Sequence, residues 1–524
     1  MLRGWTTLRT KNGPGPGEGG LLAPAALQLP PIGTAMLFGT VLLFTLLLWL
    51  ISNLEPLFFS NQNTKFLHGL ADAGYGQLAE DWMAQTVDGL PVFTRIVQWT
   101  AKVGPFWLFY VEQFLVYAVH ALALVLLFRR AHPWATGADR LPLLLFVLVF
   151  ASLHVNHDLA SGVANQLIIK SIYEPANFGA FALLGLAAFL AGRHFLAVLL
   201  INVAGAVHAG YVAPGGFLLL GMAACLPIVE RAQRRNLALA LALALGFAGL
   251  ALNTLLLKLA FPATTPALQA QATALLANER IPQHTDPTVW LNLEAMLKLA
   301  LCAAAVVLTR NRLIRRVLAV GLGAILLSAL FVVLFQADFI RLVSPWRVSV
   351  FLVPLAWVVV LGWLIEQLLP WFRRRGLVRW GVAGIVATAF AFAVYGGWSK
   401  IEKFSRPPPP YAALVEANLA PGQVYLTSPG LSGFRLRTGA PQYVSTKTHP
   451  YLDVEVLEWH RRLEIAEALF DSETLDCAAV SRLRDEEGVT HLLTVEKDPT
   501  FDCPFAVELG SDRGARLYRL DGAS

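Results

Sequence analysis

Charged residues are scarce in this chain of 524 residues: Asp, Glu, Lys and Arg make up 15% of it, whereas 56% is hydrophobic. Soluble domains carry about one quarter charged residues, so the deficit excludes an ordinary soluble domain and a disordered chain. Four cysteines are too few for a small disulfide scaffold. The sequence also lacks a P-loop, GxGxxG, HExxH and GxSxG, so no nucleotide-binding fold, zinc protease or serine hydrolase is indicated.

Apolar runs recur almost from end to end instead. A membrane-spanning helix needs about 20 apolar residues, and by this criterion the sequence predicts about eleven of them. The ranges are 33–52, 106–128, 141–155, 177–192, 195–212, 214–229, 237–259, 290–309, 317–336, 348–369 and 380–397. The predicted fold class is therefore an all-α polytopic membrane domain, followed by a small C-terminal α/β domain.

Basic residues gather in short linkers between these runs, and their positions orient the helices. The Arg-rich linkers are 129–140, 230–236, 310–316 and 370–379. Cytoplasmic loops carry such an excess, so residues 1–32 are expected to be a cytoplasmic tail and the segment after the eleventh helix to be exported. The net charge of +6 thus reflects membrane topology, and no nucleic-acid partner is expected.

The expected organisation has a membrane domain over 33–397 and an extracytoplasmic soluble domain over 398–524. In the soluble domain, strands are predicted at 423–429, 490–496 and 515–520, and a helix at 453–470. Cys477 and Cys503 lie in this domain and are expected to form a disulfide if it is exported.

The first external loop, 53–105, is the strongest candidate for a functional segment because it is far longer than a helix connection requires. Its apolar residues predict helices lying on the bilayer surface: Phe58, Phe59, Phe66, Leu67, Leu70, Leu78 and Trp82. Its polar residues would supply donors and acceptors at the membrane boundary: Asn61, Gln62, Asn63, His68, Asp72, Asp81 and Asp88. A carboxylate there can act as a general base, and the alternative is that these residues only cap and solvate surface helices.

Further candidates lie in the later external segments. His157 and Asp158, with His154, could form an acid/base or ligand cluster, although their spacing matches no established metal site. Glu174 precedes Pro175 and suits either a site or the start of a helix. His208 lies near the outer end of a helix, where an ionisable group suggests a site and a packing role is the alternative.

Two arginines near a helix break provide the clearest cationic signal. Arg341 and Arg347 flank Ser344-Pro345-Trp346 on the external side, against the positive-inside trend. Arginine offers bidentate hydrogen bonds to phosphate, so the pair could hold the phosphate of a lipid carrier. The alternatives are an ion pair with Asp338 and snorkelling to lipid headgroups.

This arrangement resembles the type-C glycosyltransferases (GT-C), multi-pass enzymes that use lipid-phosphate-linked sugars. The resemblance rests on the overall architecture and on two stretches that are similar to a bacterial branch of the superfamily, "NQNTKFLHGLADAGYGQLAEDW" (61–82) and "FRLRTGAPQYVSTKTHPY" (434–451). The Asp-Glu pair of protein O-mannosyltransferases and the WWD-type signature of oligosaccharyltransferases are absent. The resemblance implies a bacterial inner-membrane location and an extracytoplasmic glycan, lipid or protein acceptor, but it does not identify that acceptor.

The implied reaction is an inverting transfer from a polyprenyl-phosphate sugar. By loop position, Asp81 is the expected general base, with Asp72 as its rival. Arg341 and Arg347 would offset charge on the departing lipid phosphate. His157, Glu174 or His208 would orient donor or acceptor. No cofactor or metal ligand set is expected, although a divalent cation is compatible with the reaction.

Three C-terminal residues, Arg435, Lys447 and His449, are expected either to contact an acceptor glycan or to be surface charge. Two other classes of function stay open. A transporter or flippase of lipid-linked glycans would also have many helices and external arginines, but it should show internal repeats and charges along a central path. A non-catalytic scaffold of an envelope assembly complex is the third interpretation, and oligomeric state is not predicted.

Overall fold

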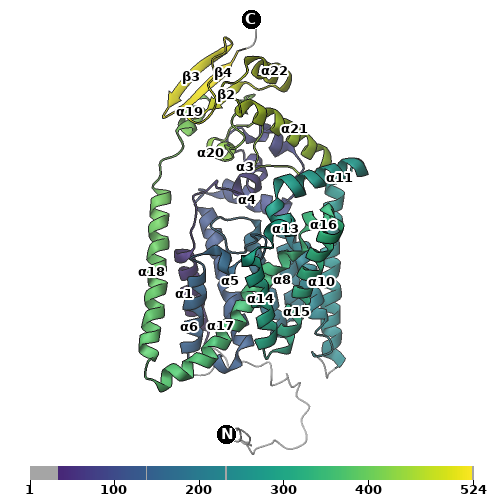
Figure 1. The fold of residues 1–524 in the computed structure, drawn as a ribbon, viewed down its shortest axis with the longest axis vertical. Helices are drawn as coiled ribbons and strands as arrows, with labels where there is room; N and C mark the ends of the chain where they lie inside the picture. Colours follow the sequence, from purple (N-terminus) through teal and green to yellow (C-terminus); the bar gives the residue numbers. More distant parts are fainter. Residues whose placement is uncertain (1–32, 137–138, 230–232, 522–524) are drawn as a thin grey trace, which may run out of the picture.

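The structure is a computed structural model that describes residues 33–136, 139–229 and 233–521. It is a bundle of helices with the C-terminal domain seated on one end (Figure 1). Each predicted membrane range carries a helix: α1 (Thr34–Ile51), α5 (Leu108–Ala131), α6 (Leu141–Leu153), α7 (Gly179–Leu190), α8 (His194–Val207), α9 (Val212–Ala223), α10 (Gln233–Ala260), α14 (Leu293–Leu308), α15 (Arg312–Phe335), α17 (Ser349–Arg374) and α18 (Val378–Phe404).

Among the described residues, six helices are long and apolar enough to cross a membrane. Helices α6 to α9 are apolar but have only 12–14 residues each, and α14 has 16. The expectation of a multi-pass membrane protein is therefore confirmed. Six of the predicted spans are helices of sufficient length, and the total of about eleven spans stays a prediction.

The basic linkers meet at the end of the bundle that faces away from the C-terminal domain. Arg373 pairs with Asp139 across two of these linkers, and the Asn311 amide donates to the backbone oxygen of Arg130 at 3.3 Å. The linker 230–236 lies largely outside the described residues. The opposite end, here called the outer end, carries the long loops and the C-terminal domain (Figure 1). This separation agrees with the predicted topology, but which end faces the cytoplasm stays a prediction.

A sharp break in the chain before α17 shapes the outer end. Short helix α16 (Asp338–Val343) ends at Ser344, which adopts a left-handed conformation, and Pro345 then opens the 3-10 turn η9 (Pro345–Val348). The break predicted around Ser344-Pro345-Trp346 is confirmed. Because the chain turns before α17 begins, Arg347 lies on the outer end of the bundle core.

The first external loop folds into α2 (Gln62–Lys65), α3 (Leu67–Asp72), the 3-10 turns η2 (Leu78–Glu80) and η3 (Trp82–Gln85), and α4 (Pro91–Val103). The predicted bilayer-facing residues Phe66, Leu67, Leu70 and Leu78 are fully buried against the protein, so that expectation was wrong. Phe66 packs on Phe93 of α4, on Phe109 of α5 and on Tyr173, so these segments cover the face that was expected to meet lipid. The exposed apolar face belongs instead to α4, where Trp99 is 67% exposed.

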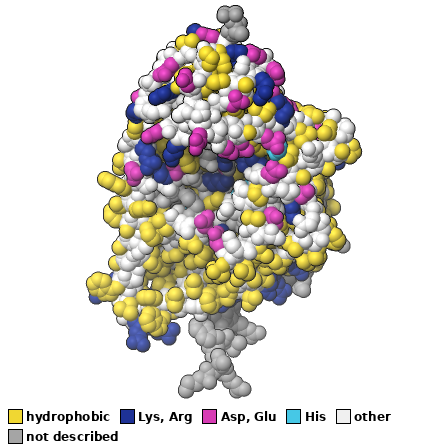
Figure 2. Space-filling view, turned by 45° about the horizontal axis from the view of Figure 1, so that its top comes forward, with side chains coloured by type: hydrophobic (Ala, Val, Ile, Leu, Met, Phe, Trp, Pro, Cys, Tyr) yellow, Lys and Arg dark blue, Asp and Glu magenta, His cyan; other side chains and the backbone are white. Residues whose placement is uncertain are grey.

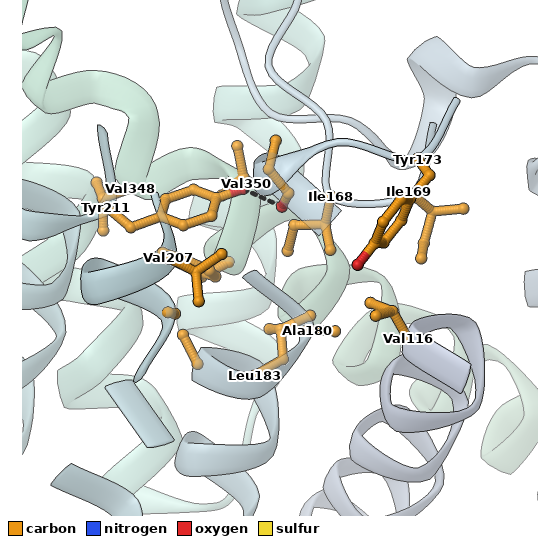
Figure 3. Close-up of a cluster of buried hydrophobic side chains, with 14 of the residues drawn as sticks. Val116, Ile168, Ile169, Tyr173, Ala180, Leu183, Val207, Tyr211, Val348 and Val350 are labelled. Atoms are coloured by element: carbon orange, nitrogen blue, oxygen red, sulfur yellow. Dashed lines mark hydrogen bonds between the residues drawn. The ribbon is translucent and has the colours of Figure 1, made fainter. Parts of the chain in front are cut away.

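An apolar layer lies beneath the outer end. Val116, Tyr173, Leu183, Tyr211 and Val350 come from five separate segments and pack together (Figure 3). The Tyr211 hydroxyl donates to the backbone oxygen of Ala176 at 2.6 Å, which satisfies the one polar group that tyrosine brings into the layer. Side chains just above this layer therefore have a rigid support.

The C-terminal domain is a small α/β unit. Its sheet has the order β1-β2-β4-β3, formed by β1 (Tyr425–Leu426), β2 (His491–Thr494), β4 (Ala515–Leu520) and β3 (Ala506–Asp512). Its helices are α19 (Pro410–Asn418), α20 (Phe434–Thr438), α21 (Asp453–Phe470) and α22 (Cys477–Glu487). The predicted strands and helix are confirmed. Strand β3 was missed, because buried and exposed residues do not alternate regularly along it.

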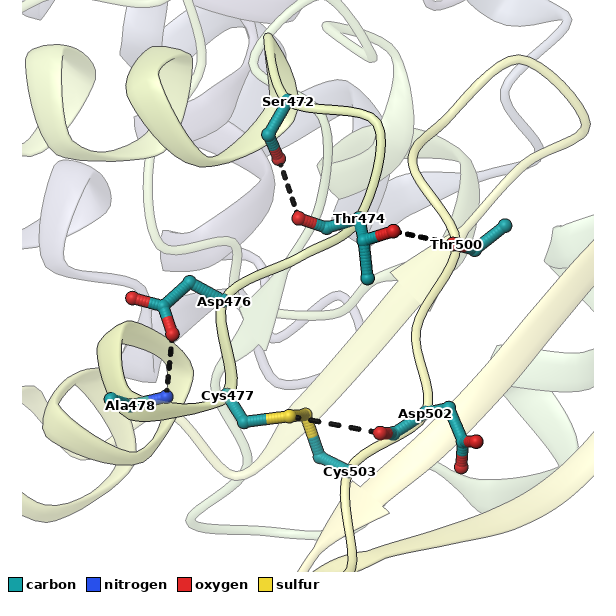
Figure 4. Close-up of a disulfide and its surroundings, with 8 residues drawn as sticks. All are labelled: Ser472, Thr474, Asp476, Cys477, Ala478, Thr500, Asp502 and Cys503. Carbon is teal, nitrogen blue, oxygen red and sulfur yellow. Dashed lines mark hydrogen bonds between the residues drawn. A yellow bond between two sulfur atoms is a disulfide. The ribbon is translucent and has the colours of Figure 1, made fainter.

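The predicted disulfide between Cys477 and Cys503 is present, with the two Cα atoms 5.6 Å apart (Figure 4). It ties the start of α22 to the segment that precedes β3. The other two cysteines, Cys225 and Cys302, are free and buried, as expected for packing residues.

Candidate functional site

Asp81, the expected general base, is fully buried where the first loop meets the C-terminal domain. Its Oδ1 atom accepts from the Met83 amide at 2.8 Å. Its Oδ2 atom accepts from Arg435 Nε at 2.6 Å and from the Gln442 amide at 2.8 Å. With three donors and no solvent exposure, this carboxylate joins two parts of the fold and is closed to an acceptor. Arg435 is likewise neither a surface charge nor a glycan contact.

Asp72 lies on the surface at the end of α3. Its side chain is 46% exposed and pairs with Arg95 at 3.3 Å. No hydrogen bond or ion pair of the described residues connects it to the other predicted site residues. Asp72 therefore remains chemically available, but it stands apart from the groups described next.

Five basic side chains converge at the outer end, below the C-terminal domain, and we call them the basic cluster: Lys65, Lys170, Arg280, Arg347 and Lys447. They come from α2, the loop before α7, the π-helical turn η8 (Leu275–Arg280), η9 and the segment between α20 and α21. Figure 2 shows Lys and Arg side chains in the recess beneath the domain. Such a convergence is unfavourable unless an anion compensates for it.

Direct contacts tie the cluster together. Lys65 Nζ donates to the Tyr451 hydroxyl at 2.8 Å, and Arg280 Nη2 donates to the backbone oxygen of Lys447 at 2.6 Å. The one carboxylate paired within the cluster is Glu174, which lies 2.5 Å from Lys170 Nζ. Asn61 donates to the other oxygen of Glu174 at 3.0 Å. One carboxylate cannot neutralise five cations, so the cluster keeps a positive charge.

The electrostatics of neighbouring groups reflect this excess. Burial lowers the pKa of Lys447 to about 8, with Arg280, Lys170 and Lys65 adding to the effect and Glu174 opposing it. Burial and the nearby Arg280 likewise hold the pKa of His449 well below its usual range. Burial alone would raise the pKa of Glu174, but Lys170 and Asn61 outweigh it and hold that pKa below its ordinary value.

Arg347 has no hydrogen-bond or ion-pair partner among the described residues, and its Nε atom is completely buried. Its guanidinium passes directly over Gly210, where an added Cβ atom would lie 1.8 Å from Nη1. His208 lies beside the same glycine and packs edge-on against Tyr211. A partly buried guanidinium without a partner is costly, which makes Arg347 the strongest candidate for contact with a bound anion.

Arg341, the other predicted phosphate ligand, already has partners at both Nη atoms, although its Nε atom is buried without one. It donates to Asn278 Oδ1 at 2.7 Å and to Gln336 Oε1, and it pairs with Asp338 at 3.4 Å. A further carboxylate, on Asp286, lies 3.8 Å away. The alternative of an ion pair with Asp338 is therefore confirmed, and Arg341 is not free for phosphate.

The remaining predicted residues are divided among several places. Asn63 is buried, and its backbone oxygen accepts from the Thr448 hydroxyl at 3.3 Å. His68 Nε2 contacts the backbone oxygen of Thr86 at 3.0 Å. Asp158 is the second residue of the 3-10 turn η5 (His157–Ala160), where its amide donates to Asn156 Oδ1. The side chain of His157 lies outside the described residues.

Glu174 has a structural role as well as a site contact. It precedes the 3-10 turn η6 (Pro175–Phe178) and forms a capping box with Asn177. The predicted alternative, that Glu174 starts a helical turn, is therefore confirmed, and its carboxylate also faces Lys170.

A small cavity adjoins the basic cluster on the side of the first loop. Its lining includes Lys65, His68, Asp88, His449 and Tyr451. Asp88 is half-buried there, and its Oδ1 atom accepts from the Leu90 amide at 2.8 Å. Asp88 is thus a first-loop carboxylate that shares a cavity with members of the cluster and their neighbours.

Sequence reasoning missed Lys65, Lys170 and Arg280, and assigned Lys447 to the acceptor or the surface. A signal was present, since each of the first three is a basic residue in a segment predicted to be external, against the positive-inside trend. Within the described residues, no group of three or more His, Cys, Asp or Glu side chains is arranged to hold a metal ion.

Comparison with known families gives one match, a domain of unknown function (DUF6798) over residues 410–466. The matched segment includes α19, β1, α20 and most of α21. It therefore contains Arg435, Lys447 and Tyr451, the residues through which the C-terminal domain reaches the first loop and the basic cluster. No curated protein matches the chain.

Proposed function

We propose that this chain is an integral membrane glycosyltransferase of the GT-C kind, which transfers a sugar from a polyprenyl-phosphate donor to an extracytoplasmic acceptor. The observation that supports it best is the basic cluster at the outer end of the helices. A lipid phosphate brings negative charge to this depth, and Lys and Arg side chains are the groups that bind it.

The donor phosphate would lie against Arg347 and Lys447, the two members of the cluster whose side chains make neither a hydrogen bond nor an ion pair within the described residues, whereas Lys65, Lys170 and Arg280 each have a partner. Lys65, Lys170 and Arg280 surround that position. In the transfer, the bond between the anomeric carbon and the phosphate oxygen breaks, and negative charge grows on the leaving phosphate. Fixed cations stabilise that charge without needing to reorganise.

The general base is assigned to Asp88 in place of Asp81. Both belong to the first external loop, but Asp88 lines a cavity next to Lys65 and Tyr451. Its carboxylate would take the proton of the acceptor hydroxyl while the hydroxyl oxygen forms the new bond to the anomeric carbon. Asp72 pairs with Arg95 on the surface and has no contact with the basic cluster among the described residues.

The membrane orientation belongs to the same proposal. The tail over 1–32 would be cytoplasmic and the C-terminal domain extracytoplasmic, as the basic linkers indicate. The disulfide in the C-terminal domain is consistent with an oxidising compartment.

The test compares lipids and envelope glycans, by mass spectrometry, from a deletion strain that carries wild-type protein, Asp88→Asn or Asp72→Asn at equal levels. We expect Asp88→Asn to leave a glycan one sugar short and to accumulate a polyprenyl-phosphate sugar, whereas Asp72→Asn restores the wild-type profile. A wild-type profile with Asp88→Asn would remove Asp88 as the base. A wild-type profile in the deletion strain itself would remove the proposed reaction.

A second measurement examines the donor site directly. Purified protein with Arg347→Ala should bind a short-chain polyprenyl phosphate about 30-fold more weakly than wild type, since a buried charge contact is lost. Arg347→Lys should recover part of the affinity. Unchanged binding by Arg347→Ala would place the phosphate elsewhere.

A further inference from the structure

A second cavity, separate from the lining of the Asp88 cavity, lies where α14 begins. It measures about 90 Å³ and is partly open. A bound water needs roughly 10–15 Å³, so this space admits several polar groups at once. We call it the α14 pocket, and its polar lining consists of Asn165, Gln283, Trp290, Asn292, Glu294 and Lys298.

The pocket has hydrogen-bonding groups without a partner among the described residues. Trp290 is only 4% exposed, and its Nε1 atom is buried and unpaired. The side-chain amides of the exposed Asn165 and the half-buried Gln283 make no hydrogen bond within the described part of the chain, so both are available to a ligand. Buried polar groups are normally satisfied, so an unpaired indole N–H in the wall of a cavity points to a ligand with acceptors.

The charges in the pocket cancel. Lys298 Nζ pairs with Glu294 and also donates to Ser161 Oγ at 2.6 Å. The lining therefore offers donors and acceptors of both kinds together with the aromatic ring of Trp290, but no net charge. Such a surface matches a ligand with many hydroxyl groups and no phosphate.

Apolar side chains surround the pocket. Short helix α13 (Pro287–Trp290) and the first turn of α14 expose Val289 by 53%, Leu291 by 46% and Leu293 by 69%, and Leu297 follows at 62%. In a membrane protein these side chains face lipid. A ligand whose head enters the pocket therefore has room for a hydrocarbon chain along α14.

The pocket and the basic cluster share a wall. The Trp290 ring packs on Trp346, with ring centroids 5.3 Å apart, and Arg347 follows in the chain. His284 Nδ1 contacts the backbone oxygen of Ala164 at 2.7 Å, which closes the space between the two sites. A head group in the pocket would lie beside a phosphate in the cluster.

We propose that the α14 pocket binds the uncharged sugar head of a membrane glycolipid. The sugar enters by one edge of its ring, accepts a hydrogen bond from Trp290 Nε1 and bonds to Asn165 and Gln283, while the lipid chain lies on Leu293 and Leu297. This inference stands on the pocket itself and does not require the proposed glycosyl transfer.

The experiment uses the full chain in phosphatidylcholine nanodiscs and an alkyl glucoside with a photoreactive diazirine. We expect labelled peptides from 163–166 and 283–298, and we expect octyl glucoside, but not octyl phosphate, to displace the probe. Gln283→Ala and Asn165→Gly should each lower labelling about fivefold, since each removes ligand hydrogen bonds. Glycine suits position 165, where φ is +53°.

The matched control is Gln271→Ala, which removes an exposed amide outside the pocket and should leave labelling unchanged. Arg347→Ala should also keep glucoside labelling while it weakens phosphate binding. The inference would be overturned if neither pocket variant changed the extent of labelling, or if octyl phosphate displaced the probe as well as octyl glucoside does. Loss of glucoside labelling in Arg347→Ala would also overturn it, because the two sites would then be one.

Discussion

Asp81 and Arg435 form a fully buried ion pair at 2.6 Å across a separation of 354 residues. The first belongs to the loop after the first helix and the second to the C-terminal domain. Arg435 also donates to Ser445 Oγ at 3.1 Å and to the backbone oxygen of Gln442 at 2.7 Å. It thereby fixes the segment that leads to Lys447 and Tyr451 in the site.

Removing one partner of this pair should destabilise the docked domain. Arg435→Ala leaves the Asp81 charge buried and unpaired, which costs about 3–5 kcal/mol. We expect a lower melting temperature and faster proteolysis near the Pro407–Pro410 run. Arg437→Ala is the control, since Arg437 lies half-buried in the same helix and forms no ion pair within the described residues. Equal melting of the two variants would contradict the stabilising role.

Replacing Gly210 should weaken anion binding without lowering the stability of the helix bundle. An alanine Cβ atom there would lie 1.8 Å from Arg347 Nη1, so the guanidinium must move. Gly210→Ala is therefore expected to weaken binding of a short-chain polyprenyl phosphate about tenfold or more. Gly216→Ala meets no atom within 4 Å and should bind as wild type does. Equal affinities, measured by the same titration, would show that Arg347 does not hold the anion.

Anion binding should also depend on pH through Lys447, whose pKa is lowered from 10.5 to about 8. As pH rises through about 8, Lys447 loses its proton and the affinity for phosphate should fall. Lys65, Lys170, Arg280, Glu174, His449 and Tyr451 surround it. Lys447→Met should remove this pH dependence between pH 7 and about 9.5, as judged by titrations at each pH.

Lys447 affects the pH dependence of stability in the opposite direction from the pH dependence of anion binding. Between pH 8 and 10.5 the unfolded chain binds the proton more tightly than the folded one, so this residue makes the fold more stable as pH rises. A melting temperature that rises while affinity falls would separate the charge effect from unfolding. If both fall together and Lys447→Met behaves identically, the assignment to Lys447 is wrong.

The disulfide can be tested by counting the free thiols. In denaturant without reductant, an alkylating reagent should modify two of the four cysteines, Cys225 and Cys302, and after reduction all four. Four alkylated thiols before reduction would contradict the bridge. Replacing Cys477 and Cys503 by alanine should cost the C-terminal domain about 3–4 kcal/mol, the loop-closure value for residues 26 apart.

Much of the fold could be predicted because it follows local patterns. Apolar runs located every membrane helix, and the periodicity over 453–470 matches α21. The lengths of the helices were harder to predict, since α7 and α8 are only 12 and 14 residues long within one nearly continuous apolar stretch. The surface role assigned to Phe66 failed for another reason, because Phe93, Phe109 and Tyr173 from later segments pack over it.

The site was predictable only in part. Arg347 and Glu174 carried local signals, a helix break and a proline, and the structure brings both to the outer end. Asp81 and Arg341 looked equally exposed in sequence, but distant segments supply partners: Arg435 pairs with Asp81, and Asn278 and Asp286 contact Arg341. Charge and loop position do not reveal such pairing, because it depends on tertiary contacts.

The contact between Lys65 and Tyr451, 386 residues apart, determines when the site can exist during synthesis. All the membrane helices leave the ribosome before Tyr451 does, so the bundle can insert while its outer end is still open. A chain interrupted after α18 would leave Asp81 without its arginine and the recess without Lys447 and Tyr451. The recess is therefore complete only after the C-terminal domain has been made and has docked on the outer end.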